Sequence, residues 1–257
     1  RTMTSLLTLR ENLAQGQPVL GMWSVLPSAG NAEILGYAGM DFVILDMEHG
    51  PYDMRSVEEG IRACEVTGCA ALVRVPGVVS AELQPVLNPG AAGIVFPRVA
   101  SIADAEHAVQ SVHFPPTGTR GMNPFTRAFQ YDPSGTPLQP LSCVIVEDAG
   151  AVHDIDAILA LPGLDMVYIG VYDLAVSLGH GSDVQHADVV SVTDMLRKKI
   201  VESHKVCGLM VRSEQELIAA LQSGVKMIVW ATDSALIRSA AHSVRESFDA
   251  AKQRSIS

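Results

Sequence analysis

The chain has 257 residues, of which 48% are hydrophobic and 18% are charged, so it can bury a large core. Its formal net charge of −10 argues against nucleic acid or an anionic membrane as a partner, because both would repel it. The four cysteines form no Cys-x-x-Cys pattern, which argues against a disulfide framework or a zinc site. No signal-peptide pattern and no membrane-length apolar run is evident, so we expect a cytoplasmic protein with reduced thiols.

The predicted elements alternate between helix and strand along the whole chain. Apolar runs rich in β-branched residues predict strands at 19–24, 42–45, 70–75, 93–96, 142–147, 166–170, 208–211 and 226–230. Helical periodicity and helix-ending glycines predict helices at 4–16, 29–39, 53–67, 80–87, 101–112, 149–160, 186–204, 213–223 and 233–253. With no linker-like segment between halves, this order predicts a single (β/α)₈ TIM barrel over residues 1–257. A doubly wound sheet is the alternative, but no GxGxxG follows the first strand.

Residues 113–140 depart from this alternation. They are rich in proline and show no clear periodicity. A long segment without regular structure inside a compact domain is usually functional. We therefore expect this loop to help shape a binding site.

Residues 41–50, Asp-Phe-Val-Ile-Leu-Asp-Met-Glu-His-Gly, give the first indication of where that site lies. The apolar run 42–45 is typical of a strand buried on both faces. It ends at Asp46, Glu48 and His49, and ionisable groups there are costly unless they have partners. Barrels and open α/β sheets place their chemistry at this end of a strand. A polar turn capping the next helix is the alternative, but three ionisable groups within four residues favour a site.

Functional side chains also follow other predicted strands. Each has a structural alternative: Arg74 as a surface charge, Glu147 as a helix start and Asp173 as an N-cap. Because the carboxyl ends of the strands meet at one face of a barrel, the set together predicts an active site there. Its members are Trp23, Asp46, Glu48, His49, Arg74, Glu147 and Asp173.

The residue types in this set favour one kind of chemistry. Glu147 and Asp173 follow adjacent strands and can hold one hard divalent ion, Mg²⁺, Mn²⁺ or Co²⁺, through oxygen. Such an ion, with open positions for a 2-oxo acid, is a Lewis acid that stabilises an enolate. Arg74 would act on the keto or enolate oxygen, and His49 would move the proton. No organic cofactor is expected.

Several motifs point to a known family: Gly21-Met-Trp23, Asp46-Met-Glu-His-Gly50, Val73-Arg-Val-Pro76, Pro115-Pro-Thr-Gly-Thr-Arg-Gly121, Glu147 and Ile169-Gly-Val-Tyr-Asp-Leu174. In this order and spacing, from about residue 20 to 235, they resemble the HpcH/HpaI aldolases. These are metal-dependent (class II) aldolases acting on pyruvate and related 2-oxo acids. The resemblance implies a barrel whose last helix is exchanged between subunits of a trimer or hexamer.

The resemblance also implies residue roles. Glu147 and Asp173 would bind the metal, His49 would be the base, and Arg74 would stabilise the enolate. Asp46 is expected to be a further catalytic residue. Trp23 and Arg74 would contact substrate. The backbone N–H groups of Gly170, Val171 and Tyr172, beside Asp173, would bind the substrate carboxylate. Glu48 and Asn88 would contact these residues and not the substrate itself.

The sequence departs from the family at three positions. Many members have an aspartate at position 88, which reaches a neighbour's histidine, whereas Asn88 cannot stabilise an imidazolium by charge. Ile145 replaces a common glutamine, and Val171 replaces a common proline. These differences leave the acceptor open.

Three functions are therefore considered, in descending order of preference. The first is a lyase that cleaves or forms 4-hydroxy-2-oxo acids from pyruvate, or a close analogue, and an aldehyde. The second is a citrate-synthase-like condensation of oxaloacetate with acetyl-CoA. The third is a non-catalytic binder of 2-oxo acids. A wide apolar stripe on residues 233–250 supports the expected homo-oligomer.

Overall fold

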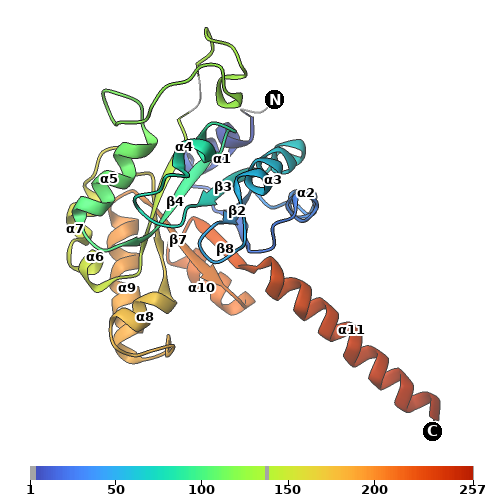
Figure 1. Cartoon of the computed structure of the whole chain (residues 1–257). Helices are drawn as coiled ribbons and strands as arrows, with labels where there is room; N and C mark the ends of the chain where they lie inside the picture. Colours follow the sequence, from blue (N-terminus) through green and yellow to red (C-terminus); the bar gives the residue numbers. More distant parts are fainter. Residues whose placement is uncertain (1–3, 137–138, 257) are drawn as a thin grey trace.

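The computed structural model describes residues 4–136 and 139–256, and its strands close into one parallel barrel in chain order (Figure 1). Each strand pairs with the next, and the last pairs with the first. The prediction of an eight-stranded α/β barrel is confirmed. The strands are β1 (Val19–Ser24), β2 (Phe42–Asp46), β3 (Ala70–Arg74), β4 (Gly93–Val99), β5 (Leu141–Val146), β6 (Met166–Ile169), β7 (Val206–Val211) and β8 (Met227–Thr232).

Most helices pack around the barrel, whereas the first covers its amino-terminal end and the last projects away from it (Figure 1). They are α1 (Thr4–Ala14), α2 (Ala29–Tyr37), α3 (Met54–Thr67), α4 (Leu83–Leu87), α5 (Ile102–Val112), α6 (Ala149–His153), α7 (Ile155–Leu159), α8 (Val171–Ser177), α9 (Ala187–Glu202), α10 (Glu214–Gln222) and α11 (Asp233–Ile256). None of these described helices is both long enough and apolar enough to cross a bilayer.

The sequence-based elements were wrong in three places. The single helix predicted at 149–160 is two short helices, because Asp154 interrupts it and accepts a hydrogen bond from the backbone of Ile102. Helix α8 was not predicted, since seven residues are too few to show a helical period. The predicted loop 113–140 contains the 3₁₀ turn Arg127–Phe129, and its residues 137–138 lie outside the described part of the chain.

Alternation along the strands divides the core into two parts. In β2, Phe42 and Ile44 point into the barrel, whereas Val43 and Leu45 pack against the helices. All four are completely buried, as expected for a strand of a parallel barrel. Leu6 and Leu9 of α1 join the interior cluster and fill the amino-terminal end of the barrel. A site can therefore form at the carboxyl-terminal mouth.

Helix α11 is anchored at its first residue and then leaves the barrel (Figure 1). The buried carboxylate of Asp233 accepts hydrogen bonds from Ser24 Oγ at 2.8 Å and from the backbone N–H of Val25 at 3.0 Å. Beyond this anchor the helix exposes large apolar side chains, among them Val244 (69% exposed) and Phe248 (56% exposed). Such a face is costly in water and is typical of an interaction surface.

Gly21 provides a test of how tightly the strands pack. A Cβ at Gly21 would lie 2.5 Å from the carbonyl oxygen of Phe42, which the barrel holds in place. We expect Gly21→Ala to lower the free energy of unfolding by roughly 1–3 kcal/mol or more in urea titrations. Gly30→Ala is the matched control, because its Cβ meets nothing closer than 3.8 Å. Equal stability of the two variants would contradict the close β1–β2 packing.

Candidate active site

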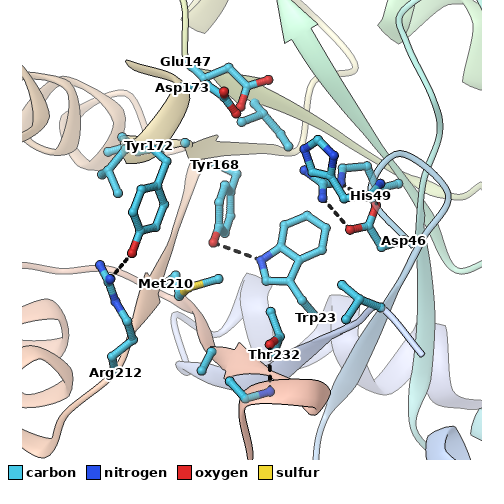
Figure 2. Close-up of a pocket in the computed structure, with 18 residues that line it drawn as sticks. Trp23, Asp46, His49, Glu147, Tyr168, Tyr172, Asp173, Met210, Arg212 and Thr232 are labelled. Atoms are coloured by element: carbon cyan, nitrogen blue, oxygen red, sulfur yellow. Dashed lines mark hydrogen bonds and ion pairs between the residues drawn. The ribbon is translucent and has the colours of Figure 1, made fainter. Parts of the chain in front are cut away.

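A cavity of about 430 Å³ opens at the carboxyl-terminal mouth of the barrel (Figure 2). Most of the predicted site residues line it, namely Trp23, Asp46, His49, Arg74, Glu147, Gly170, Val171, Tyr172 and Asp173. Glu48 lies behind Arg74 and contacts it. Asn88 is not part of the cavity wall, since it follows the end of α4.

The alternation of the strands explains why these side chains meet. Ala70 and Leu72 of β3 point into the barrel, so Arg74, two residues further, points into its mouth. The same two-residue step leads from Ile44 to Asp46 and from Ile145 to Glu147. The interior pattern of the strands thus determines which side chains reach the cavity.

Asp46 and Arg74 form a buried ion pair. The carboxylate accepts hydrogen bonds from Arg74 Nε at 2.8 Å and from Arg74 Nη2 at 2.5 Å. Asp46 Oδ1 also accepts the backbone N–H groups of Glu48 and His49. Burial lowers the pKa of Arg74, but Asp46 and Glu48 outweigh it and raise the pKa overall. Arg74 is 9% exposed, so the alternative of a surface charge is wrong.

Glu48 connects this pair to a residue that the sequence did not single out. Its carboxylate lies 3.1 Å from Arg74 Nη1 and 3.0 Å from Arg98 Nε. Burial is the main cause that raises the pKa of Glu48. The imidazole of His49 is 63% exposed, and its Nε2 lies 3.9 Å from Glu48. Two arginines thus hold Glu48 next to the exposed imidazole of His49.

Arg98 stands at an irregularity in the barrel. The register between β4 and β5 shifts between Phe96 and Val99, and Arg98 has φ +54°, a left-handed conformation that non-glycine residues seldom adopt. This turn lets the Arg98 N–H donate to Glu147 Oε1 at 2.7 Å. The only signal in the sequence was Pro97, directly after the predicted strand 93–96, whereas β4 continues to Val99. A proline there does not specify such a contact.

Glu147 and Asp173 lie together on one side of the cavity (Figure 2). Glu147 is 6% exposed, and burial, with the nearby charges of Asp173 and Glu48, raises its pKa to about 7. A Cβ at Gly170 would lie 2.5 Å from Glu147 Oε2, so the glycine leaves room for this carboxylate. The N–H of Gly170 already donates to Val146, which leaves the predicted carboxylate-binding N–H groups at Val171 and Tyr172.

The donor set at this position fits a hard divalent cation. Two carboxylates line the cavity, and within the described residues the side chain of Asp173 makes no hydrogen bond or ion pair. Burying one carboxylate beside another is unfavourable without a cation, as the raised pKa of Glu147 reflects. Oxygen ligands and space for water are what Mg²⁺ and Mn²⁺ prefer.

Aromatic side chains form the remaining wall. Trp23 Nε1 donates to the hydroxyl of Tyr168 at 3.2 Å, and the two rings meet edge to face. The guanidinium of Arg74 lies over the Trp23 ring, 4.3 Å from its centre. On the other side, Arg212 donates a hydrogen bond to the hydroxyl of Tyr172. Tyr168 and Arg212 were not predicted, although both belong to the interior-facing series of their strands.

A barrel whose mouth gathers buried carboxylates, an arginine and a histidine is the architecture of an enzyme. The chain belongs to the HpcH/HpaI aldolase/citrate lyase family, whose model matches residues 19–240. It is 31% identical over 243 residues to the hydroxypyruvate/pyruvate aldolase of Roseobacter denitrificans, covering 92% of this chain and 95% of that protein. The prediction of an aldolase-family enzyme is confirmed.

Solved structures agree with this assignment. A family member from Burkholderia cenocepacia superposes with a TM-score of 0.86 at 30% identity, covering 93% of this chain and 98% of its own. The citrate synthase SbnG superposes with a TM-score of 0.85 at 26% identity, covering 97% and 99%. The fold is thus shared by proteins named for different reactions.

The pKa of Glu147 yields a prediction for the metal-free protein. Because this pKa is about 7 in the folded chain against an ordinary 4.5, the folded chain keeps a proton that the unfolded chain loses. The free energy of unfolding should therefore fall as pH rises from about 4.5 to 7. Glu147→Gln should remove this loss and stabilise the metal-free protein at pH 8 by up to roughly 3 kcal/mol.

Urea unfolding in EDTA at pH 4 and pH 8 measures the effect. Glu106→Gln, on the exposed face of α5, is the control and should show no such difference. A Glu147→Gln variant less stable than the wild type at pH 8 would show that Glu147 is not an unfavourable buried charge.

Proposed function

We propose that this enzyme reversibly joins pyruvate, or a close analogue, to an aldehyde and so forms a 4-hydroxy-2-oxo acid. In that direction a methyl C–H bond of pyruvate breaks, and its proton leaves to a base. The resulting enolate carbon bonds to the aldehyde carbon, and the aldehyde oxygen takes up a proton. The observation that carries the proposal is that Arg74 and the Glu147–Asp173 pair face the same cavity.

Glu147 and Asp173 are proposed to hold the divalent metal, Mg²⁺, Mn²⁺ or Co²⁺. When bound, this ion supplies positive charge that lowers the energy of a developing enolate. The 2-oxo acid's carboxylate is proposed to accept the N–H groups of Val171 and Tyr172, which precede the first internal hydrogen bond of α8, from Leu174 to Gly170. Trp23 would form the wall beside it.

Arg74 is proposed to donate to the oxygen that becomes negative as the enolate forms. Asp46 and Glu48 hold its guanidinium from behind, so it needs no rearrangement during the reaction. In this scheme Asp46 acts by orienting Arg74, because its two oxygens already accept hydrogen bonds from protein groups.

His49 is proposed to move the proton. It lines the cavity, is open to solvent and lies next to Glu48. Asn88 lies away from the cavity of its own chain, so we infer that it orients the imidazole of a neighbouring chain. The four buried free cysteines support a cytoplasmic location, and we propose that residues 1–257 form one catalytic domain.

Proton exchange tests this function without knowledge of the aldehyde. The metal-loaded protein in D₂O should exchange the methyl protons of pyruvate, as followed by NMR, and EDTA should stop the exchange. Arg74→Ala should slow it by roughly 10²–10³, since one donor to a developing oxyanion is lost. Arg74→Lys should recover only part of the rate, because the lysine ammonium group keeps the positive charge but lacks the planar guanidinium with its several donors.

Two results would refute the proposal. One is a wild-type protein that binds pyruvate with metal yet exchanges no protons, which is the behaviour of a non-catalytic binder. The other is thiol release from acetyl-CoA and oxaloacetate that is faster than turnover with any aldehyde. The second result would favour condensation of the kind that gives the structural relative SbnG its name.

We also propose that α11 packs on a neighbouring subunit of a trimer or hexamer. Val244 and Phe248 lie one turn apart on its exposed apolar face, and their own barrel does not cover them. The double variant Val244→Asp, Phe248→Asp should therefore elute as a smaller species in size exclusion with light scattering. Glu246→Gln, on the polar side of the same helix, should not change the size. An unchanged assembly in the double variant would rule out this interface.

A further inference from the structure

The alternation of side chains along the strands also places a second arginine, Arg212, at the cavity. In β7, Val206 and Met210 pack with the barrel interior, and Arg212 continues this series two residues beyond Met210. Its side chain lines the same cavity as Arg74 and Glu147. The position of Arg212 is thus set by the barrel, in the same way as the positions of the other charged residues at the mouth.

Arg212 differs from the other two arginines around the cavity in its partners. Arg74 and Arg98 each contact carboxylates. Within the described residues, no carboxylate lies within ion-pair distance of the Arg212 guanidinium. It donates to the hydroxyl of Tyr172 and lies 5.1 Å from the centre of that ring. Several guanidinium N–H groups therefore remain available to a ligand.

Tyr172 separates Arg212 from the proposed reaction centre. In Figure 2 the carboxylates of Glu147 and Asp173 lie beyond one end of Tyr172, and Arg212 lies at its hydroxyl end. Met210 and Thr232 form the nearby wall and carry no charge. The carboxylate of Glu216 lies close by, but it accepts the backbone N–H of Arg212 at 2.7 Å and forms no ion pair with the guanidinium. A ligand group that reaches this part of the cavity would therefore meet a guanidinium that is not paired with a carboxylate of the described residues.

We propose that Arg212, steadied by Tyr172, binds an anionic group on the aldehyde substrate, a carboxylate or a phosphate. The inference rests on the proposed function and specifies its acceptor. The carboxylate of the 2-oxo acid is already accounted for by the N–H groups of α8, so the anion at Arg212 belongs to the other reactant. The planar fork of a guanidinium donates two parallel hydrogen bonds to either kind of anion.

Arg212 is exposed and stands at the rim of the cavity. A charged end group can therefore remain partly hydrated while the aldehyde carbon reaches the enolate. The contribution of Arg212 should consequently appear in KM for the aldehyde more than in kcat, because it binds a part of the substrate whose charge does not change during the reaction.

The test compares charged and neutral aldehydes with one pyruvate concentration. Succinic semialdehyde carries a carboxylate, glyceraldehyde 3-phosphate carries a phosphate, and propionaldehyde and glyceraldehyde carry neither. In Arg212→Met the preference for charged over neutral aldehydes, as a ratio of kcat/KM, should fall roughly 10- to 100-fold. Arg212→Lys should retain part of it. The two charged substrates show which anion the wild type favours.

Arg55→Met is the matched control, because this exposed arginine of α3 lies outside the cavity and pairs with Glu59 on its own helix. Its selectivity should equal that of the wild type. The inference is overturned if the wild type does not prefer charged aldehydes, or if Arg212→Met lowers kcat/KM equally for all four. It is also overturned if Arg212→Met mainly raises KM for pyruvate in the proton-exchange assay, which would assign Arg212 to the 2-oxo acid.

The exchange assay separates this failure from that of the proposed function. If the wild type exchanges pyruvate protons but shows no preference for charged aldehydes, only the proposed anion subsite at Arg212 is refuted. If the wild type exchanges no protons, both the proposed function and the subsite are refuted.

Discussion

The two-residue alternation of strands in a closed parallel barrel is the constraint on which this structure depends. It sends every second side chain inward, and the interior is filled by apolar groups such as Phe42 and Ile44. Where each strand leaves the filled part, the next inward position opens into the mouth. Asp46, Arg74 and Glu147 occupy such positions. Stability and site geometry therefore come from the same backbone pattern.

The charges at the mouth are tolerated because they are arranged as a connected series. Asp46 holds Arg74, Arg74 contacts Glu48, Glu48 contacts Arg98, and the Arg98 backbone reaches Glu147. Removing one partner of such a buried pair typically costs about 3–5 kcal/mol, since the other charge is left uncompensated. The left-handed backbone at Arg98 is the kind of strain that structures retain at functional sites.

Tyr172 lies between two parts of the cavity (Figure 2). On one side lie the carboxylates and Arg74, which suit a 2-oxo acid and a metal. On the other lies Arg212, whose charge has no acidic partner in the described structure. Proteins of similar fold are named for different reactions, and the side chains at such rims are where substrates can differ without change to the barrel.

The sequence by itself determined the barrel, its strand order and the carboxyl-terminal location of the site, because periodicity and the ends of apolar runs are local signals. It also identified Arg74 and Glu147, which lie at the carboxyl ends of buried strands. Only the tertiary structure showed that Asp46 forms an ion pair with Arg74 and that the Gly170 N–H donates to Val146. It also showed that Arg98 contacts Glu48 and Glu147 and that Arg212 lines the cavity. These facts depend on register shifts and on contacts between distant strands, and no local pattern encodes which side chains will meet across a barrel mouth.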